Sequence, residues 1–155
     1  MGQMVMIQKA LALKESYELY INEELKYYIK RRKLLTSKPV YDIFTEEGVV
    51  AFAEVTSSTA PRIYKLTFGD TDGGEVVYNE TPGVNKLIYE QKGLEITGNS
   101  NLTEFTVKNK DKKVTGTVKK KIVSMKDTYD ISYEDDSEDL LFAMLALLID
   151  ETFHG

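Results

Sequence analysis

A run of ten apolar residues near the end of the chain constrains the fold more than any other feature. It extends from Leu140 to Ile149 without a Gly, a Pro or a charged residue, and it is rich in strong helix formers. A helix that is apolar on all sides has to be buried on all sides. Ten residues rise only about 15 Å, too little to cross the roughly 30 Å hydrocarbon layer of a bilayer. The sequence therefore predicts a core helix over about 137–152, which Asp136 or Ser137 can cap.

The chain before this helix, from about residue 4 to residue 133, alternates between apolar and polar residues in short segments. Tyr17, Leu19 and Ile21, for example, alternate with Glu18 and Tyr20, as in a strand with one buried face. Turn-forming residues separate the segments, and Asp70 to Gly74 is expected to be one such turn. The spacing predicts roughly eleven or twelve short strands in a barrel or a sandwich.

An internal repeat runs through these strands. Residues 121–131 can be laid without a gap over residues 33–43 and over residues 9–19. Each copy ends a strand, places a Lys at a turn and opens the next strand with a Tyr, an acid and an aliphatic residue. The turn lysines are Lys14, Lys38 and Lys126, and the tyrosines are Tyr17, Tyr41 and Tyr129. Repeated hairpins build a meandering antiparallel sheet.

If the sheet closes around the helix, the apolar face of the sheet and the apolar surface of the helix bury each other. Closure also removes the edge strands, which would otherwise promote aggregation. We therefore predict a single domain over residues 1–155 with a mainly β fold, a closed antiparallel β-barrel enclosing the C-terminal helix. Leu145 and Leu148 should point into the barrel interior, and Ala143 and Ala146 should mark close approaches of the strands.

The C-terminal third resembles a known family. Residues 114–129 contain a strand that ends in lysines, followed by a Ser-x-x-Asp-Thr-Tyr segment. Glu138, Asp139, the apolar run and Ile149-Asp150 follow in that order. This arrangement resembles the LURP-one-related proteins. These are small domains of the tubby C-terminal-like and phospholipid scramblase superfamily. The resemblance is strong from about residue 107 to residue 154 and looser elsewhere. It implies a twelve-stranded β-barrel threaded by a hydrophobic helix, and it associates the chain with phosphoinositide headgroups and membranes, although fold alone does not supply a function.

Composition excludes several classes of protein. The chain has no Cys, which removes disulfides and thiol chemistry, and its net charge of −5 argues against broad nucleic-acid binding. Residues Met1 to Ile7 lack the basic segment and long apolar run of a signal peptide. We expect a cytoplasmic protein, which would be peripheral to a membrane if it binds lipid, and the sequence leaves its oligomeric state open.

Basic residues are segregated in two stretches despite the net negative charge. Lys119 and Lys121 should project from one face of a strand together with Thr115 and Thr117, and ammonium groups beside hydroxyls suit phosphate. We expect these lysines to form one basic patch for an anionic headgroup with neighbours from the same stretch and from the repeat copy. The candidate ligand-binding residues are Lys108, Lys110, Lys112, Lys113, Lys119, Lys121, Arg31, Arg32 and Lys33. Lysines on an outer barrel face also serve solubility alone.

The sequence offers no recognisable catalytic apparatus. His154 is the only histidine; it could touch Asp150 one helical turn earlier, but a frayed chain end is favoured. Asp70-x-Asp72-x-Gly74 departs from a calcium loop. The resemblance to scramblases would place calcium at the acids between Asp135 and Asp139, but helix capping explains these acids without a metal. We expect no enzyme, no cofactor and no metal site.

Two functional hypotheses remain. The first is a non-catalytic barrel that binds an anionic phospholipid headgroup or a peripheral membrane surface. The second is a protein-interaction or regulatory module that uses the barrel exterior and has no lipid ligand. A broad apolar patch on the outside would favour the second.

Overall fold

A computed structural model describes residues 1–9, 16–32, 38–123 and 126–154. Twelve strands follow one another in this part of the chain, with two short 3₁₀ turns and one helix. The strands are β1 (Gly2–Gln8), β2 (Ser16–Ile21), β3 (Glu24–Arg31), β4 (Val40–Thr45), β5 (Gly48–Ser57), β6 (Arg62–Phe68), β7 (Thr71–Tyr78), β8 (Lys86–Tyr89), β9 (Leu94–Gly98), β10 (Glu104–Lys108), β11 (Val114–Val123) and β12 (Lys126–Tyr133). The turns are η1 (Glu90–Lys92) and η2 (Asp136–Glu138), and the helix is α1 (Asp139–Phe153).

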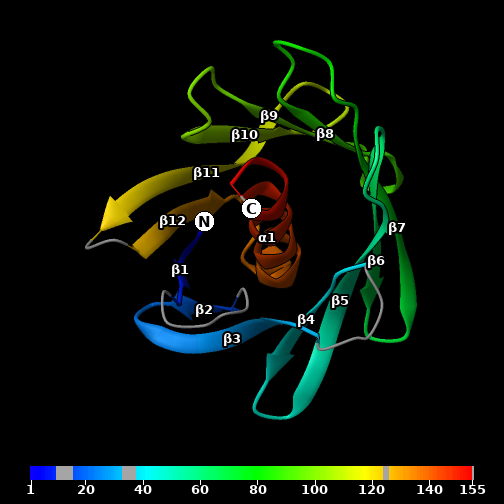
Figure 1. The fold of residues 1–155 in the computed structure, drawn as a ribbon. Coiled ribbons are helices and arrows are strands. Elements are labelled where there is room, and N and C mark those ends of the chain that lie inside the picture. Colours follow the sequence, from blue (N-terminus) through cyan, green and yellow to red (C-terminus); the bar gives the residue numbers. More distant parts are fainter. Residues whose placement is uncertain (10–15, 33–37, 124–125, 155) are drawn as a thin grey trace.

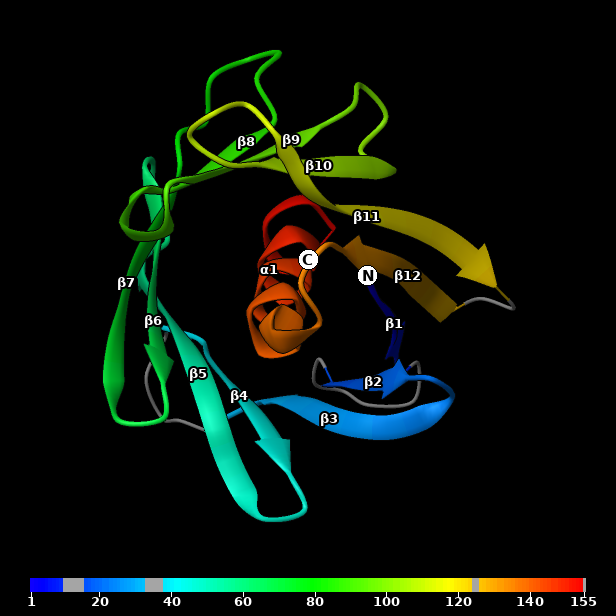
Figure 2. The ribbon, with the colours of Figure 1, turned by 180° about the vertical axis from the view of Figure 1, so that it is seen from behind.

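The strands form one closed antiparallel barrel around the helix, as predicted (Figure 1). Each strand pairs with its neighbours in the sequence, and β1 pairs with β12 to close the ring, from Gly2 opposite Tyr133 to Ile7 opposite Thr128. The helix lies along the barrel axis and is surrounded by strands, which the view from behind also shows (Figure 2). The closed ring leaves no strand edge open for pairing with another chain.

The core is the space between the inner faces of the strands and the helix. Every residue of the helix from Phe142 to Glu151 is buried, and Ala143, Leu145, Ala146 and Leu148 are all 0% exposed. The predicted all-round burial of the apolar run is therefore confirmed. No helix in the described part of the chain has the length and apolarity needed to cross a membrane.

The helix packs tightly against the sheet at Gly116 of β11. A Cβ atom built on Gly116 would lie 2.2 Å from the ring of Phe142, well inside van der Waals contact. The same ring stacks on Tyr133 of β12, with centroids 5.0 Å apart and planes inclined by 13°. A glycine is required at this position because the first turn of the helix presses an aromatic ring against the strand backbone.

Two local predictions are corrected by the structure. The helix begins at Asp139 and not at 137, because Asp136–Glu138 form the 3₁₀ turn η2, which is capped by Asp135. The predicted turn over Asp70–Gly74 is mostly strand: β7 begins at Thr71, and a register shift beside Thr67, with a φ of +81° at Gly74, keeps it paired to β6.

The two ends of the barrel differ, and we name them after the helix. The N-end is where α1 begins, beside the β2–β3 turn at Asn22–Glu23 and the β10–β11 hairpin loop at 109–113. The C-end is where α1 finishes, beside the starts of β2, β4, β6 and β12. The repeat copies cover the β1–β2, β3–β4 and β11–β12 hairpins, which are neighbours in the ring. Lys14 of the repeat lies outside the described residues.

Candidate functional site

The C-end of the barrel contains a polar cluster that sequence reasoning missed. Asp150, on the last turns of α1, is only 1% exposed. The hydroxyl groups of Tyr17 and Tyr129 both donate hydrogen bonds to its carboxylate. A buried carboxylate is stable only when hydrogen-bond donors replace its lost water, and the two phenols do so here.

The adjacent Glu151 is held in the same way. Its carboxylate accepts a hydrogen bond from the hydroxyl of Tyr41 at 2.5 Å and forms an ion pair with the guanidinium of Arg62. One residue further on, the hydroxyls of Tyr64 and Thr152 lie 2.7 Å apart. The last turn of the helix is therefore tied to β2, β4, β6 and β12 at once.

The three repeat tyrosines are the donors in this cluster. Tyr17, Tyr41 and Tyr129 occupy the same position in the three copies, and each hydrogen-bonds a helix carboxylate. The repeat was visible in the sequence, and the pair Asp150-Glu151 directly follows the apolar run. The signal that could have located the cluster is this coincidence of three equivalent tyrosines with two acids at the end of a buried helix.

Two phenols of the cluster, those of Tyr129 and Tyr64, keep their protons at neutral pH. Burial, followed by the negative charge of Asp150, raises the pKa of Tyr129 well above the ordinary value for tyrosine. Burial also raises the pKa of Tyr64 to about 12. Both shifts disfavour the phenolate because a charge in this apolar setting lacks water. The cluster therefore has a structural role, because it fixes the C-terminal end of the helix to the surrounding strands.

His154 is ordered, which corrects the prediction of a frayed end. Its Nε2 lies 2.7 Å from the carbonyl oxygen of Leu102 in the β9–β10 loop, and its ring packs edge-on against Phe105. Its backbone N–H donates to the carbonyl of Asp150, while its side chain points to the loop. The histidine therefore closes the C-end through its contact with the β9–β10 loop.

The acids at the N-end hold the start of the helix. Asp135 accepts hydrogen bonds from the N–H and the hydroxyl of Ser137, and these bonds lower its pKa. Asp136 pairs with the amino group of Met1 at 3.2 Å. Asp139 binds Lys26 at 2.5 Å and the hydroxyl of Tyr27 at 3.1 Å. No group of three acids or histidines among the described residues is arranged to hold a metal ion.

The outer face of β11 carries the clearest candidate ligand site. Gly116 and Val118 point inward and are buried, so Thr115, Thr117, Lys119 and Lys121 face outward together. A surface hollow over β11, β12 and β1 is lined by Lys119 and Lys121, together with Gln3, Met4, Val5, Thr117, Asp130, Ile131 and Ser132. We call this the basic hollow. Lys121 pairs with Asp130 at 2.5 Å, whereas Lys119 makes no ion pair with any described residue.

The other lysines of the second basic stretch lie at the N-end. Lys110, Lys112 and Lys113 belong to the β10–β11 loop, and Lys108 ends β10. Lys112 lies 3.6 Å from Glu95, and Lys113 lies 3.0 Å from Glu134. The aliphatic chain of Lys110 packs over Gly93. Most of these lysines are therefore engaged with acids or with the chain.

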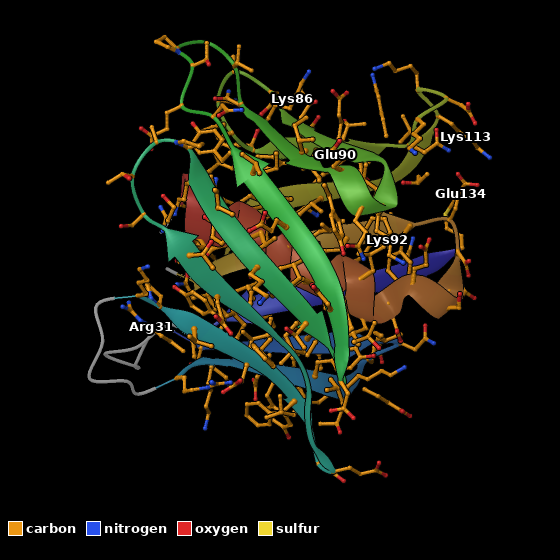
Figure 3. The ribbon with its side chains drawn as sticks, turned by 90° about the vertical axis from the view of Figure 1, so that its right-hand side faces the viewer. Arg31, Lys86, Glu90, Lys92, Lys113 and Glu134 are labelled. Carbon is orange, nitrogen blue, oxygen red and sulfur yellow. The ribbon has the colours of Figure 1, made fainter. Side chains whose placement is uncertain are left out.

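The expected single basic patch is wrong. Val114 and Lys121 are seven positions apart along β11, a length of about 23 Å, so the hairpin-loop lysines and the basic hollow are distinct. Arg31 and Arg32 lie at the C-end, four strand steps from β11 in the ring, and Arg32 pairs with Asp42. Figure 3 shows Arg31 and Lys113 at opposite ends of the barrel. Lys33 lies outside the described residues.

Comparison of the chain with protein-family models, with curated proteins and with solved structures finds no match. The interpretation of the sites therefore depends on their geometry. The polar cluster inside the barrel can hold a helix. The lining of the basic hollow outside it contains two ammonium groups, two hydroxyls and an amide that can bind an anion, beside the Asp130 carboxylate.

Proposed function

We propose that the protein is a non-catalytic barrel of the LURP-one-related kind that docks through its basic hollow on the anionic phospholipid headgroups of a membrane surface. The observation that carries this proposal is the shared outward face of Thr117, Lys119 and Lys121 above one hollow. Ammonium groups supply charge, and nearby hydroxyls supply directed hydrogen bonds to phosphate oxygens. The twelve-stranded barrel around a hydrophobic helix is also the fold that the resemblance implies.

The interior of the barrel supports an external site. The helix fills the space inside the strands, and the carboxylates of Asp150 and Glu151 are bound by tyrosine and arginine side chains. His154 is bound to a loop carbonyl. These groups are therefore poor candidates for a general base, which needs access to its substrate.

The expected attachment is weak and sensitive to salt. A lysine near an anionic membrane surface contributes about 1 kcal/mol, and Asp130 beside Lys121 opposes part of that attraction. Exposed charges are screened beyond about 8 Å at physiological ionic strength. Binding should therefore be clear at low salt and fall steeply as salt is added.

The test is co-sedimentation of the protein with vesicles of phosphatidylcholine alone and with vesicles that also contain phosphatidylserine or a phosphoinositide. We expect binding only to the anionic vesicles, and we expect Lys119→Glu/Lys121→Glu to abolish it. A matched control is Lys112→Glu/Lys113→Glu, which changes the net charge equally at the N-end and should retain binding. An excess of inorganic phosphate tests whether a free anion competes for the hollow.

Several outcomes would contradict the proposal. Equal binding to neutral and anionic vesicles would show that the charges do not matter. Equal losses in the two double variants would show that only net charge matters and that the basic hollow has no special part.

A further inference from the structure

An unusual row of apolar side chains covers the outside of the barrel next to the basic hollow. In β3, Tyr27 and Ile29 are buried inside, so the half-buried Tyr28 between them faces out. The same alternation places a side chain of this row on the outside of each strand from β1 to β5. We call it the outer belt: Val5, Tyr20, Tyr28, Phe44 and Phe52. None of these five residues belongs to the hydrophobic core.

The strand register makes neighbours of most residues of the outer belt. Between β2 and β3, Glu18 lies opposite Tyr28, two residues before Tyr20. Val5 is directly opposite Tyr20, and Tyr28 is directly opposite Phe44. Phe52 is opposite Asp42, two residues before Phe44, which makes the two phenylalanines diagonal neighbours. The rings of Tyr28 and Phe44 stack with centroids 5.3 Å apart. Single apolar residues scattered over a protein surface are common, but here four aromatic residues lie outside the core on adjacent strands. Such a grouping indicates an interaction surface.

Cations lie over the rings of the outer belt. The ammonium of Lys30 is 5.7 Å from the centroid of Phe44, and the guanidinium of Arg32 is 5.2 Å from that of Phe52. At these distances the ring faces attract the cations. The belt therefore presents aromatic rings and positive charge together.

Three acids beside the outer belt, Glu18, Asp42 and Glu54, interact with neighbouring groups. Glu18 binds Lys9 at 2.6 Å and the hydroxyl of Tyr20 at 3.0 Å. Asp42 binds Arg32, and Glu54 acts on the same guanidinium. Lys30 makes no ion pair with any residue that the structure describes, as is also true of Lys119 in the basic hollow. The face therefore carries cations that can turn to an anionic partner.

We infer that the outer belt is the apolar half of the membrane contact and that it lies at the boundary between headgroups and acyl chains of an anionic bilayer. This inference rests on the proposed function, because Val5 lines both the basic hollow and the neighbouring hollow beside Tyr20. Aromatic residues favour the membrane interface, where a ring meets acyl chains and a hydroxyl meets water. The basic hollow and Lys30 then contact the lipid phosphates, while the side chains of the outer belt contact the acyl chains next to the phosphates.

The chain has no tryptophan, so a single introduced tryptophan reports its own surroundings. Phe44→Trp places the probe in the outer belt, and Ile88→Trp places a control on β8, on another side of the barrel. On addition of anionic vesicles we expect a blue shift for Phe44→Trp and quenching by brominated acyl chains, with neither change for Ile88→Trp. Phe44→Ser/Phe52→Ser should weaken vesicle binding several-fold while far-ultraviolet circular dichroism stays unchanged.

The outcomes separate this inference from the proposed function. If the vesicles bind through Lys119 and Lys121 but the tryptophan at position 44 shows neither shift nor quenching, the inference fails and the proposed function stands. If no vesicle binds, both fail. A concentration-dependent shift of the Phe44→Trp signal without vesicles would identify a second copy of the chain as the occupant of the belt and would overturn the inference.

Discussion

At the scale of single residues, the molecule depends on how it satisfies two buried carboxylates. Asp150 and Glu151 would each be costly inside the barrel without hydrogen-bond donors. The donors come from tyrosines that lie far away in the sequence; Tyr17 and Asp150 are 133 positions apart. A phenol suits this task because its ring fills the core and its hydroxyl reaches the acid.

Removing one of these hydroxyls should destabilise the fold. Tyr129→Phe takes away a donor to a buried carboxylate, and such a loss costs about 1–3 kcal/mol. Chemical denaturation monitored by circular dichroism measures the free energy of unfolding. The matched control is Tyr20→Phe on the outside, where the partner Glu18 keeps its ion pair with Lys9, and its effect should be much smaller. Equal stabilities of the two variants would contradict a structural role of the Tyr129 hydroxyl.

Alkaline pH should open the same cluster. Burial raises the pKa values of Tyr64, to about 12, and of Tyr129, while an unfolded tyrosine ionises near pH 10. The folded state therefore retains protons that the unfolded state has released. This contribution is fully present below about pH 10 and is lost as the pH rises toward the folded pKa values, by about 1.4 kcal/mol per pH unit for each such tyrosine. Denaturation midpoints measured between neutral pH and about pH 12 should fall only above about pH 10, and a flat profile would disagree.

At the scale of elements, the helix and the barrel are fitted to each other at both ends. The N-end holds the helix through Asp139, Lys26 and Tyr27, and the C-end holds it through the polar cluster. Between the two ends the contact is apolar, and Gly116 sets how closely β11 can approach.

Gly116→Ala should test that close approach. The added methyl group would clash with the ring of Phe142, and overpacking of this kind costs about 1–3 kcal/mol. Phe142→Leu removes the ring and should itself destabilise the protein by opening a cavity. The double variant should be less destabilised than the sum of the two single variants, because the leucine leaves room for the methyl group. Strict additivity of the unfolding free energies would show that Gly116 and Phe142 do not compete for space.

At the scale of the whole molecule, neither the sheet nor the helix can be stable alone. The inner faces of twelve strands and the surface of α1 are apolar, and each covers the other. Closure also joins β1 to β12 at opposite ends of the chain. Folding is therefore expected to be cooperative over the full length.

A chain that ends at Ser137 should not fold. Its barrel would expose an apolar interior to water, and the truncated sheet should aggregate. The point variant Leu145→Asp should have a related but smaller effect, because an unpartnered carboxylate in the core costs several kcal/mol. Size-exclusion chromatography and thermal denaturation distinguish the results. A soluble, cooperatively melting truncation would refute the interdependence of helix and barrel.

The sequence by itself determined the architecture. The ten apolar residues from Leu140 to Ile149 form a helix that must be buried on all sides. The strands alternate between apolar and polar residues, so their sheet has one apolar face that can surround this helix. These signals are local, because periodicity along a few residues decides which face a side chain occupies. The outward direction of Lys119 and Lys121 follows from the same local rule.

The tertiary structure decided everything that depends on which strands become neighbours and how they are staggered. It brought Tyr17, Tyr41 and Tyr129 to the two acids at the end of the helix, and it ordered His154 against a distant loop. It also separated the lysines near residue 110 from Lys121, although they are close in the sequence, because a strand carries the chain from one end of the barrel to the other. Contacts across a closed sheet are set by register and closure, and those are properties of the whole ring.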